Sequence, residues 1–383
     1  MVHLHPFSAH HVAPDQVKEF ASPPIDSLSS YEIDRVIDKQ PHSLLGIIQP
    51  HQKENFQNIR NRFLKSPYLI REPTPSFYIY EIIQQNRVYK GIIAGVSCNN
   101  DSTGIVLPHE NTLEKREKLF EKYLETVQFN AEPVLLAFED SKPIQQLLND
   151  YSKQSPFYDF TLFTQRHRLW KISDCEKISN IKSIFENHST LYIADGHHRW
   201  ASSCRLSKSS LSQKAQYCMC FLLPASSLQL DSFYRIIDFS KHLTCNEFIS
   251  RLSHTFTVSL SKKYQTPGHK KSFSFYTNGD WYIANYPKKT ELTAVELLYK
   301  KIINPILGIE NDRNNPRIEY GYSQHPNKLI EEKIKERSDF LGITHFPINF
   351  EQIKSKADQG VMLPPKSSYI QPKMISGMLL HAW

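Results

Sequence analysis

The longest apolar runs in this sequence, residues 91–96 and 218–223, have the length of one buried β-strand. A membrane-spanning helix needs about 18 apolar residues, so no such span is expected. The first residues, MVHLHPFSAHHVAP, lack the basic start and the apolar stretch of a secretory signal. Because 40% of the residues are hydrophobic, the chain can still bury a sizeable core. These features predict a globular protein that stays in the cytoplasm.

Strand-like and helix-like patterns alternate along the whole chain. Residues 77–80 and 91–96 predict two paired strands. Ser29 and Glu32 fit a capping box that opens a helix over residues 30–40. Further elements are predicted as helices at residues 112–128, 197–206 and 291–303, and as strands at residues 191–194, 216–223, 273–276 and 281–284. This mixture predicts an α+β (mixed α/β) fold.

A weak change of character near residue 240 suggests two regions. Residues 1–240 form an N-terminal α/β region that carries the candidate anion site described below. An additional mixed sheet is expected beside the core of the junction. Residues 241–383 are expected to form a C-terminal α/β region whose PPKSS tail completes the site. The sequence indicates no oligomeric state.

The formal net charge of +7 comes from 46 Lys and Arg residues against 39 Asp and Glu residues. On a chain of this size the bias is mild, so it suits an anionic small-molecule substrate and does not indicate a nucleic-acid partner. The six cysteines are scattered without a CxxC motif or a ladder with histidines. This pattern predicts reduced thiols and no structural zinc.

The strongest functional signal is LYIADGHHRWASS at residues 191–203, where an apolar strand runs into DGHHR and then into a helix. The first amides of a helix point outward, and its dipole presents partial positive charge there. Together with His197, His198 and Arg199, the backbone after Gly196 predicts a seat for a phosphate or carboxylate. In the alternative reading, Asp195 caps the helix and the histidines are exposed without a function.

A metal site is a second alternative for the same segment. Neighbouring helical residues point about 100° apart, whereas metal-binding helices use positions i and i+4. His197 and His198 therefore predict no tightly bound transition metal. Mg²⁺ that arrives with a nucleotide requires only one or two carboxylates, and Asp195 is its candidate ligand.

A second segment, VLPHENTLEKREKLF at residues 106–120, places His109 and Glu110 before a predicted helix start. Asn111 and Glu114 fit a capping box at that start. Glu110 is a candidate general base for a hydroxyl group or water. Its other interpretation is a charged lead-in to the helix.

A third segment, PPKSSY at residues 364–369, holds Lys366 and Ser367 behind two prolines. The prolines stiffen the approach and fix the direction of the lysine, which suits a phosphate or carboxylate. Taken alone, this segment also fits a proline-rich surface tail.

Together these segments resemble the bacterial and archaeal family called domain of unknown function 1015. The resemblance covers nearly the whole chain. The family usually has tyrosine at the positions of Ile25 and Trp200. Trp200 keeps an aromatic side chain, whereas Ile25 does not, so the resemblance assigns no role to the Pro-Pro-x-Asp loop. The matching motifs, in order, are PF at residues 6–7, SPPID at 22–26, PHENT at 108–112, RLW at 168–170, ADGHHR at 194–199, PILGI at 305–309 and the PPKSS tail.

The strand–DGHHR–helix segment is also similar to the phosphate-binding element of the ParB/sulfiredoxin-like superfamily, which implies a core of that kind around the junction. The superfamily includes nucleotide-hydrolysing partition proteins, sulfiredoxins and free-serine kinases. In the serine kinases an acidic residue upstream of this element acts on the serine hydroxyl, and Glu110 stands in the corresponding order.

These observations lead to the hypothesis of a phosphoryl-transfer enzyme, a kinase or a phosphatase, for a small polar metabolite, with serine or phosphoserine as the first candidate. Glu110, Asp195 and His198 are the predicted catalytic residues. ATP or ADP with Mg²⁺ is the expected cofactor. Two alternatives stay open: a ParB-like nucleotide-binding regulator without metabolic turnover, and a metal-dependent hydrolase that uses the histidine pair. The predicted phosphate- and substrate-binding residues are His109, Gly196, His197, Arg199, Lys366 and Ser367.

Overall fold

The computed structural model describes residues 1–25, 28–49, 55–99, 105–187, 190–239, 243–313, 315–335, 337 and 339–383. Asp26 of the SPPID motif lies outside these residues. The chain forms two compact units. Unit 1 comprises Met1–Pro108, Thr112–Leu228 and Pro372–Trp383, and unit 2 comprises His109–Asn111 and Gln229–Gln371.

The change of unit at residues 228–229 lies before the division expected near residue 240. The reason is that β14 (Tyr234–Asp238) pairs with β18 (Ile318–Gly321) and β19 (Phe340–His345) of unit 2 and not with the sheet of unit 1. The last residues then return to unit 1, where β21 (His381–Ala382) pairs with β7 (Phe129–Asn130).

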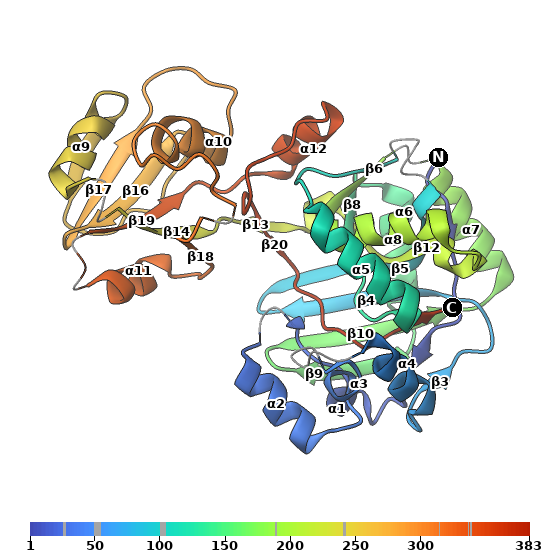
Figure 1. The fold of residues 1–383 in the computed structure, drawn as a ribbon. Helices are drawn as coiled ribbons and strands as arrows, with labels where there is room; N and C mark the ends of the chain where they lie inside the picture. The colour runs from blue at the N-terminus through green and yellow to red at the C-terminus, as the bar shows by residue number, and fades with distance from the viewer. Residues whose placement is uncertain are drawn as a thin grey trace. The chain divides into compact units, whose positions relative to one another are not determined.

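Unit 1 contains, in its described part, a nine-stranded mixed sheet (Figure 1). β11 pairs in parallel with β6, and β12 pairs in parallel with β8, while the other neighbours on the path are antiparallel. β1 (Leu4–His5) pairs with β5 beside the main path. The order along that path is β6 (Val106–Leu107), β11 (Leu191–Asp195), β8 (Val134–Phe138), β12 (Tyr217–Pro224), β5 (Arg87–Ser97), β4 (Phe77–Gln84), β10 (Gln165–Ile172) and β9 (Tyr158–Leu162).

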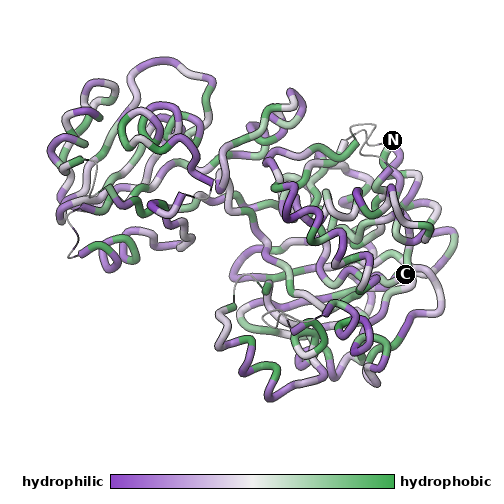
Figure 2. Tube along the Cα trace, in the orientation of Figure 1, coloured by the Kyte–Doolittle hydropathy of each residue, from purple (hydrophilic) through white to green (hydrophobic). Residues whose placement is uncertain are grey.

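The central strands of this sheet are buried because both of their faces are covered. β8 is buried at every residue, and only the first residue of β12 is partly exposed. Helices α6 (Lys142–Tyr151), α7 (Cys175–Glu186) and α8 (His197–Ser209) contribute apolar side chains to the main core cluster. By contrast, α2 (Ser30–Lys39) is mostly exposed and mainly hydrophilic (Figure 2). Leu191 and Ile193 of β11, the strand at the candidate site, belong to the main core cluster, so this strand is anchored in a closely packed core.

Unit 2 contains an antiparallel sheet in the order β15 (Thr257–Ser261), β17 (Asp280–Asn285), β16 (Ser272–Thr277), β19 (Phe340–His345), β14 and β18 (Ile318–Gly321). Its two faces pack against different helices. α9 (Cys245–Ser253) and α10 (Ala294–Leu298) share one core cluster with the sheet, and α11 (Pro326–Ile334) shares another. A π-helical turn, Tyr299–Ile303, continues α10.

The prediction of a mixed α/β fold is confirmed. β4 and β5 form the predicted hairpin, and Ser29 and Glu32 form the predicted capping box at the start of α2. Among the described residues, every helix is too short or too polar to pass through a membrane.

One predicted boundary is wrong. The helix expected from residue 112 is α5 (Glu114–Val127), and its N-cap is Leu113, whose side chain makes no capping bond. Asn111 lies two residues before this N-cap, and its main-chain carbonyl oxygen accepts a hydrogen bond of 2.6 Å from Arg313 Nη1 within unit 2.

Candidate functional site

The junction between β11 and α8 is a buried strand followed by one glycine and a helix. Gly196 is the N-cap of α8 and has a φ angle of +93°, in the left-handed region that favours glycine. The amide of Trp200 donates to the carbonyl of Gly196 at 2.9 Å, so the preceding amides lie ahead of the first helical hydrogen bond. The helix dipole adds partial positive charge at this end. The junction therefore has the backbone arrangement that anion-binding helix starts use.

Asp195 does not cap this helix. Its Oδ1 lies 3.2 Å from Lys373 Nζ, and its Oδ2 lies 3.2 Å from Arg199 Nη2. Burial raises the pKa of Asp195, but the positive charges of Lys373 and Arg199 outweigh it and hold the pKa below its ordinary value. Asp195 is therefore an ionised carboxylate between two cations.

The same contacts show whether Asp195 can serve as a ligand of Mg²⁺. Each oxygen of the Asp195 carboxylate contacts a cationic side chain, and a metal ion there would face the charges of Lys373 and Arg199. Asp195 therefore does not fit its predicted role as a magnesium ligand. Among the described residues, no group of three or more His, Cys, Asp or Glu side chains is arranged to hold a metal ion.

Arg199 joins Asp195 to a second carboxylate. Its Nη1 lies 2.5 Å from Glu132 Oε1, and the two side chains are 24% and 27% exposed. The side chain folds back over Gly196, where a Cβ atom would lie 2.9 Å from Arg199 Nε. Four side chains of alternating charge thus lie in a row, which we call the ion-pair row: Lys373, Asp195, Arg199 and Glu132. Its two cations and two carboxylates balance, so these four side chains together carry no net charge.

His197 and His198 occupy the first turn of α8, and both are partly buried. The side chains that follow fix this turn: Trp200 is buried in the core, and Ser202 Oγ donates to the carbonyl oxygen of His198 at 2.7 Å. Successive helical residues point about 100° apart, so the two imidazoles face different directions.

His109 and Glu110 lie in unit 2. Glu110 forms a parallel β-bridge with Leu363, and the amide of Leu363 donates to the carbonyl of His109 at 2.9 Å. Residues 109–111 are thus attached to the chain just before the PPKSS segment. His109 is buried, whereas Glu110 is partly exposed.

Lys366 lies in a turn of the same unit and has a φ angle of +54°. The carbonyl oxygen of Lys366 accepts a hydrogen bond of 3.3 Å from Arg235 Nη2, and the ammonium group of Lys366 lies 5.1 Å from the centre of the Phe233 ring. Ser367 is buried, and its hydroxyl donates to the carbonyl of Pro364 at 2.5 Å. The hydroxyl of Ser367 thus stabilises the turn, which does not fit its predicted role as a phosphate ligand.

The predicted site residues fall into two groups. Residues 195–199 lie together at the β11–α8 junction in unit 1, and Glu110 and Lys366 lie on adjoining segments of unit 2. The meeting of the two groups around one ligand stays a prediction.

Sequence reasoning missed Lys373, Glu132 and Arg235. Lys373 follows the PPKSS motif closely, so its position in that segment was the only available signal. Nothing local marks Glu132 or Arg235, because their partners lie far away along the chain.

The family model described as Protein of unknown function (DUF1015) matches residues 4–306, which is most of the chain. The chain belongs to this family. In the DUF1015 protein described here, the match includes PHENT and ADGHHR. None of the curated proteins matches its sequence significantly.

Three solved structures illustrate what this DUF1015 protein is similar to. SbnI with a C-terminal truncation from Staphylococcus aureus has a TM-score of 0.42 and 9% identity over 73% of this chain and 82% of its own. A free serine kinase in complex with AMP has a TM-score of 0.38 and 15% identity over 78% and 95%. A conserved hypothetical protein from Pyrococcus furiosus has a TM-score of 0.37 and 15% identity over 77% and 97%.

Proposed function

We propose that this protein is a phosphoryl-transfer enzyme for a small polar metabolite, with serine or phosphoserine as the first candidate. The observation that supports this most directly is the β11–α8 junction, where Gly196 turns a buried strand into a helix whose first amides precede the first helical hydrogen bond. The resemblance of the DGHHR segment to the ParB/sulfiredoxin-like phosphate-binding element supports the same ligand chemistry.

The roles follow from the groups at hand. The amides after Gly196, with His197, His198 and Arg199, bind the phosphate that is transferred. Glu110 takes the proton of the attacking hydroxyl, and Lys366 stabilises the charge that develops on the phosphoryl oxygens. Phosphoryl transfer depends mostly on positioning and charge stabilisation, and these groups provide both. A kinase and a phosphatase would use the same groups, so the proposal covers both directions.

The nucleotide is the proposed phosphate donor or acceptor, and the amides at the start of α8 are its proposed contacts. No divalent cation is assigned to Asp195, because both of its oxygens contact cationic side chains.

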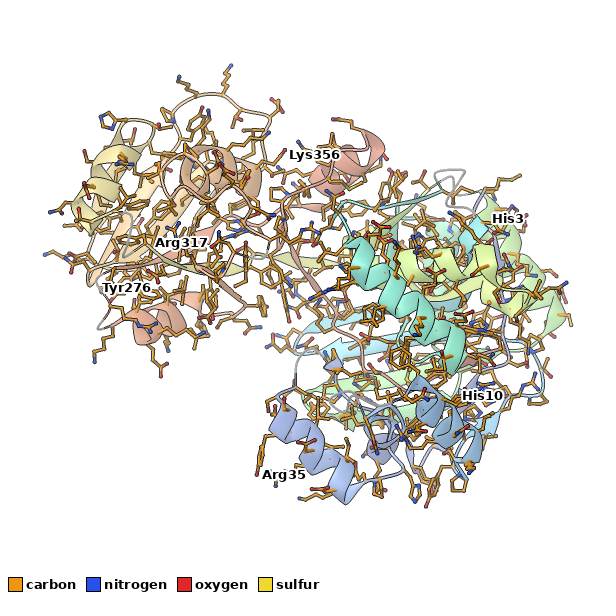
Figure 3. All side chains as sticks on the ribbon, in the orientation of Figure 1. His3, His10, Arg35, Tyr276, Arg317 and Lys356 are labelled. Carbon is orange, nitrogen blue, oxygen red and sulfur yellow. The ribbon has the colours of Figure 1, made fainter. Side chains whose placement is uncertain are left out.

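The test is a turnover assay with a panel of nucleotides and phosphorylated metabolites, with and without Mg²⁺. The wild type is compared with His198→Ala and Glu110→Gln. The control is His3→Ala, since His3 lies in unit 1 with a 57% exposed side chain (Figure 3). We expect turnover of at least one pair of substrates, a loss of about 100-fold or more in both site variants, and no change in the control.

Other outcomes would contradict the proposal. If the wild type turns over nothing in the panel, or if both site variants match it, phosphoryl transfer at this site is wrong. Nucleotide binding without turnover would favour the regulator alternative, and activity that depends on stoichiometric zinc or manganese would favour the hydrolase alternative.

A further inference from the structure

The C-terminal segment contributes Lys373 to the ion-pair row. Its path through unit 1 is fixed by backbone hydrogen bonds: the amide of Ser376 donates to Ser22 at 2.8 Å, and the amide of Gly377 donates to Ala131 at 2.9 Å. Five apolar side chains that follow Lys373 are buried, namely Met374, Ile375, Met378, Leu379 and Leu380. Lys373 therefore stands at the start of a firmly packed segment, and its backbone is held in place.

The side chain of Lys373 remains accessible. It is 31% exposed, and that of its partner Asp195 is 36% exposed. An ammonium group has three hydrogen-bond donors on a flexible stem, so it can reorient toward an oxygen atom that arrives from solvent. Lys373 thus combines a fixed backbone with an ammonium group that solvent can reach.

The charges in the row favour Lys373 as the cation that meets a ligand. Arg199 contacts two carboxylates, Asp195 and Glu132, whereas Asp195 contacts two cations. If Lys373 turns toward an incoming anion, Asp195 keeps its ion pair with Arg199. Releasing Arg199 instead would break its ion pairs with both Asp195 and Glu132.

We propose that Lys373 is a phosphate-binding residue of the β11–α8 junction, held beside Asp195 until a phosphate group binds its ammonium. The ligand class is a phosphate monoester or the terminal phosphate of a nucleotide. The proposal rests on the proposed function and deepens it, because it adds a cation from the C-terminal segment to a site otherwise built from residues 195–199.

The test measures binding of inorganic phosphate and of ADP by calorimetry at several salt concentrations. The variants are Lys373→Met, Lys373→Arg and the control Lys153→Met. Lys153 lies in unit 1, has a 75% exposed side chain and pairs with Asp150, so the control removes the same charge from an exposed ion pair that does not involve residues 195–199. Thermal melting of each variant monitors folding.

We expect Lys373→Met to weaken both ligands by about tenfold or more and to reduce the salt dependence of binding, because a charge-assisted hydrogen bond is lost. Lys373→Arg is expected to stay within about threefold of the wild type, and Lys153→Met is expected to match it. If Lys373→Met does not fold, Lys373→Gln replaces it as a neutral polar variant of similar reach.

Failure of this proposal differs from failure of the proposed function. If the neutral Lys373 variants bind phosphate and ADP as tightly as the wild type while His198→Ala does not, the role of Lys373 is wrong and the site stands. If the wild type binds neither ligand, both proposals are wrong.

Discussion

Gly196→Ala tests the geometry of the β11–α8 junction. An alanine at a φ angle of +93° costs about 1–2 kcal/mol, because its Cβ atom crowds the backbone in the left-handed region. The new Cβ atom would also lie 2.9 Å from Arg199 Nε and 3.0 Å from Nη2. The guanidinium can move away, but it then leaves Asp195 and Glu132, and each partly exposed pair contributes up to about 1 kcal/mol.

The expected loss is therefore about 1–2 kcal/mol from the backbone and up to about 2 kcal/mol more from Arg199. Urea unfolding of wild type, Gly196→Ala, Arg199→Ala and the double variant measures both contributions. In the Arg199→Ala background only the backbone cost should remain, so the two substitutions should be non-additive. Gly279→Ala is the matched control, because Gly279 has a φ angle of +83° and open space around the new Cβ atom.

One pattern of results would refute this reasoning. If Gly196→Ala costs no more than Gly279→Ala, and the double variant is additive within about 0.5 kcal/mol, then Arg199 does not depend on the glycine. The close approach at residue 196 would then have no energetic consequence.

Two predictions concern the buried cluster behind Lys366 in unit 2. His345 is neutral because burial, and then the charge of Arg235, lower its pKa from 6.5 to about 3, so the unfolded chain binds a proton at higher pH than the folded one. The contribution of this lowered pKa to the free energy of unfolding is complete above about pH 6.5 and is lost as the pH falls, by about 2 kcal/mol at pH 5. In urea titrations, the free energy of unfolding of a His345→Gln variant should therefore depend less on pH than that of the wild type. An equal pH dependence in both proteins would contradict the lowered pKa. Arg235→Met removes the hydrogen-bond donor to the Lys366 carbonyl and the contact of 2.8 Å to His345. Because buried acceptors are then left without a donor, it should cost about 1–3 kcal/mol and speed amide hydrogen exchange at residues 366–367. Unchanged exchange would show that Arg235 does not hold this turn.

Local signals in the sequence determined the secondary structure around the site. The apolar run before Asp195 predicted β11, and the helix expected from His197 is α8. The capping box at Ser29 likewise set the start of α2. Each of these depends on neighbours within a few positions, which is the range over which periodicity and capping act.

The start of α5 shows where local reasoning ends. Asn111 and Glu114 have the spacing of a capping box, yet Leu113 is the N-cap and Asn111 belongs to unit 2. The backbone contacts of residues 109–111 with Leu363 and Arg313 override the local preference. A capping pattern is a weak preference, and tertiary contacts of the backbone decide against it here.

The sequence by itself determined that a strand, a glycine and a helix meet at residues 191–209, because these signals are local. Only the tertiary structure decided which charges meet there. Lys373 reaches Asp195 across 178 positions of the chain, and Glu132 reaches Arg199 from the connection between β7 and β8. A lysine in a proline-rich segment has the same local pattern whether it is solvated or paired. Its partner is set by the path of the backbone and by the packing of the apolar residues that follow it.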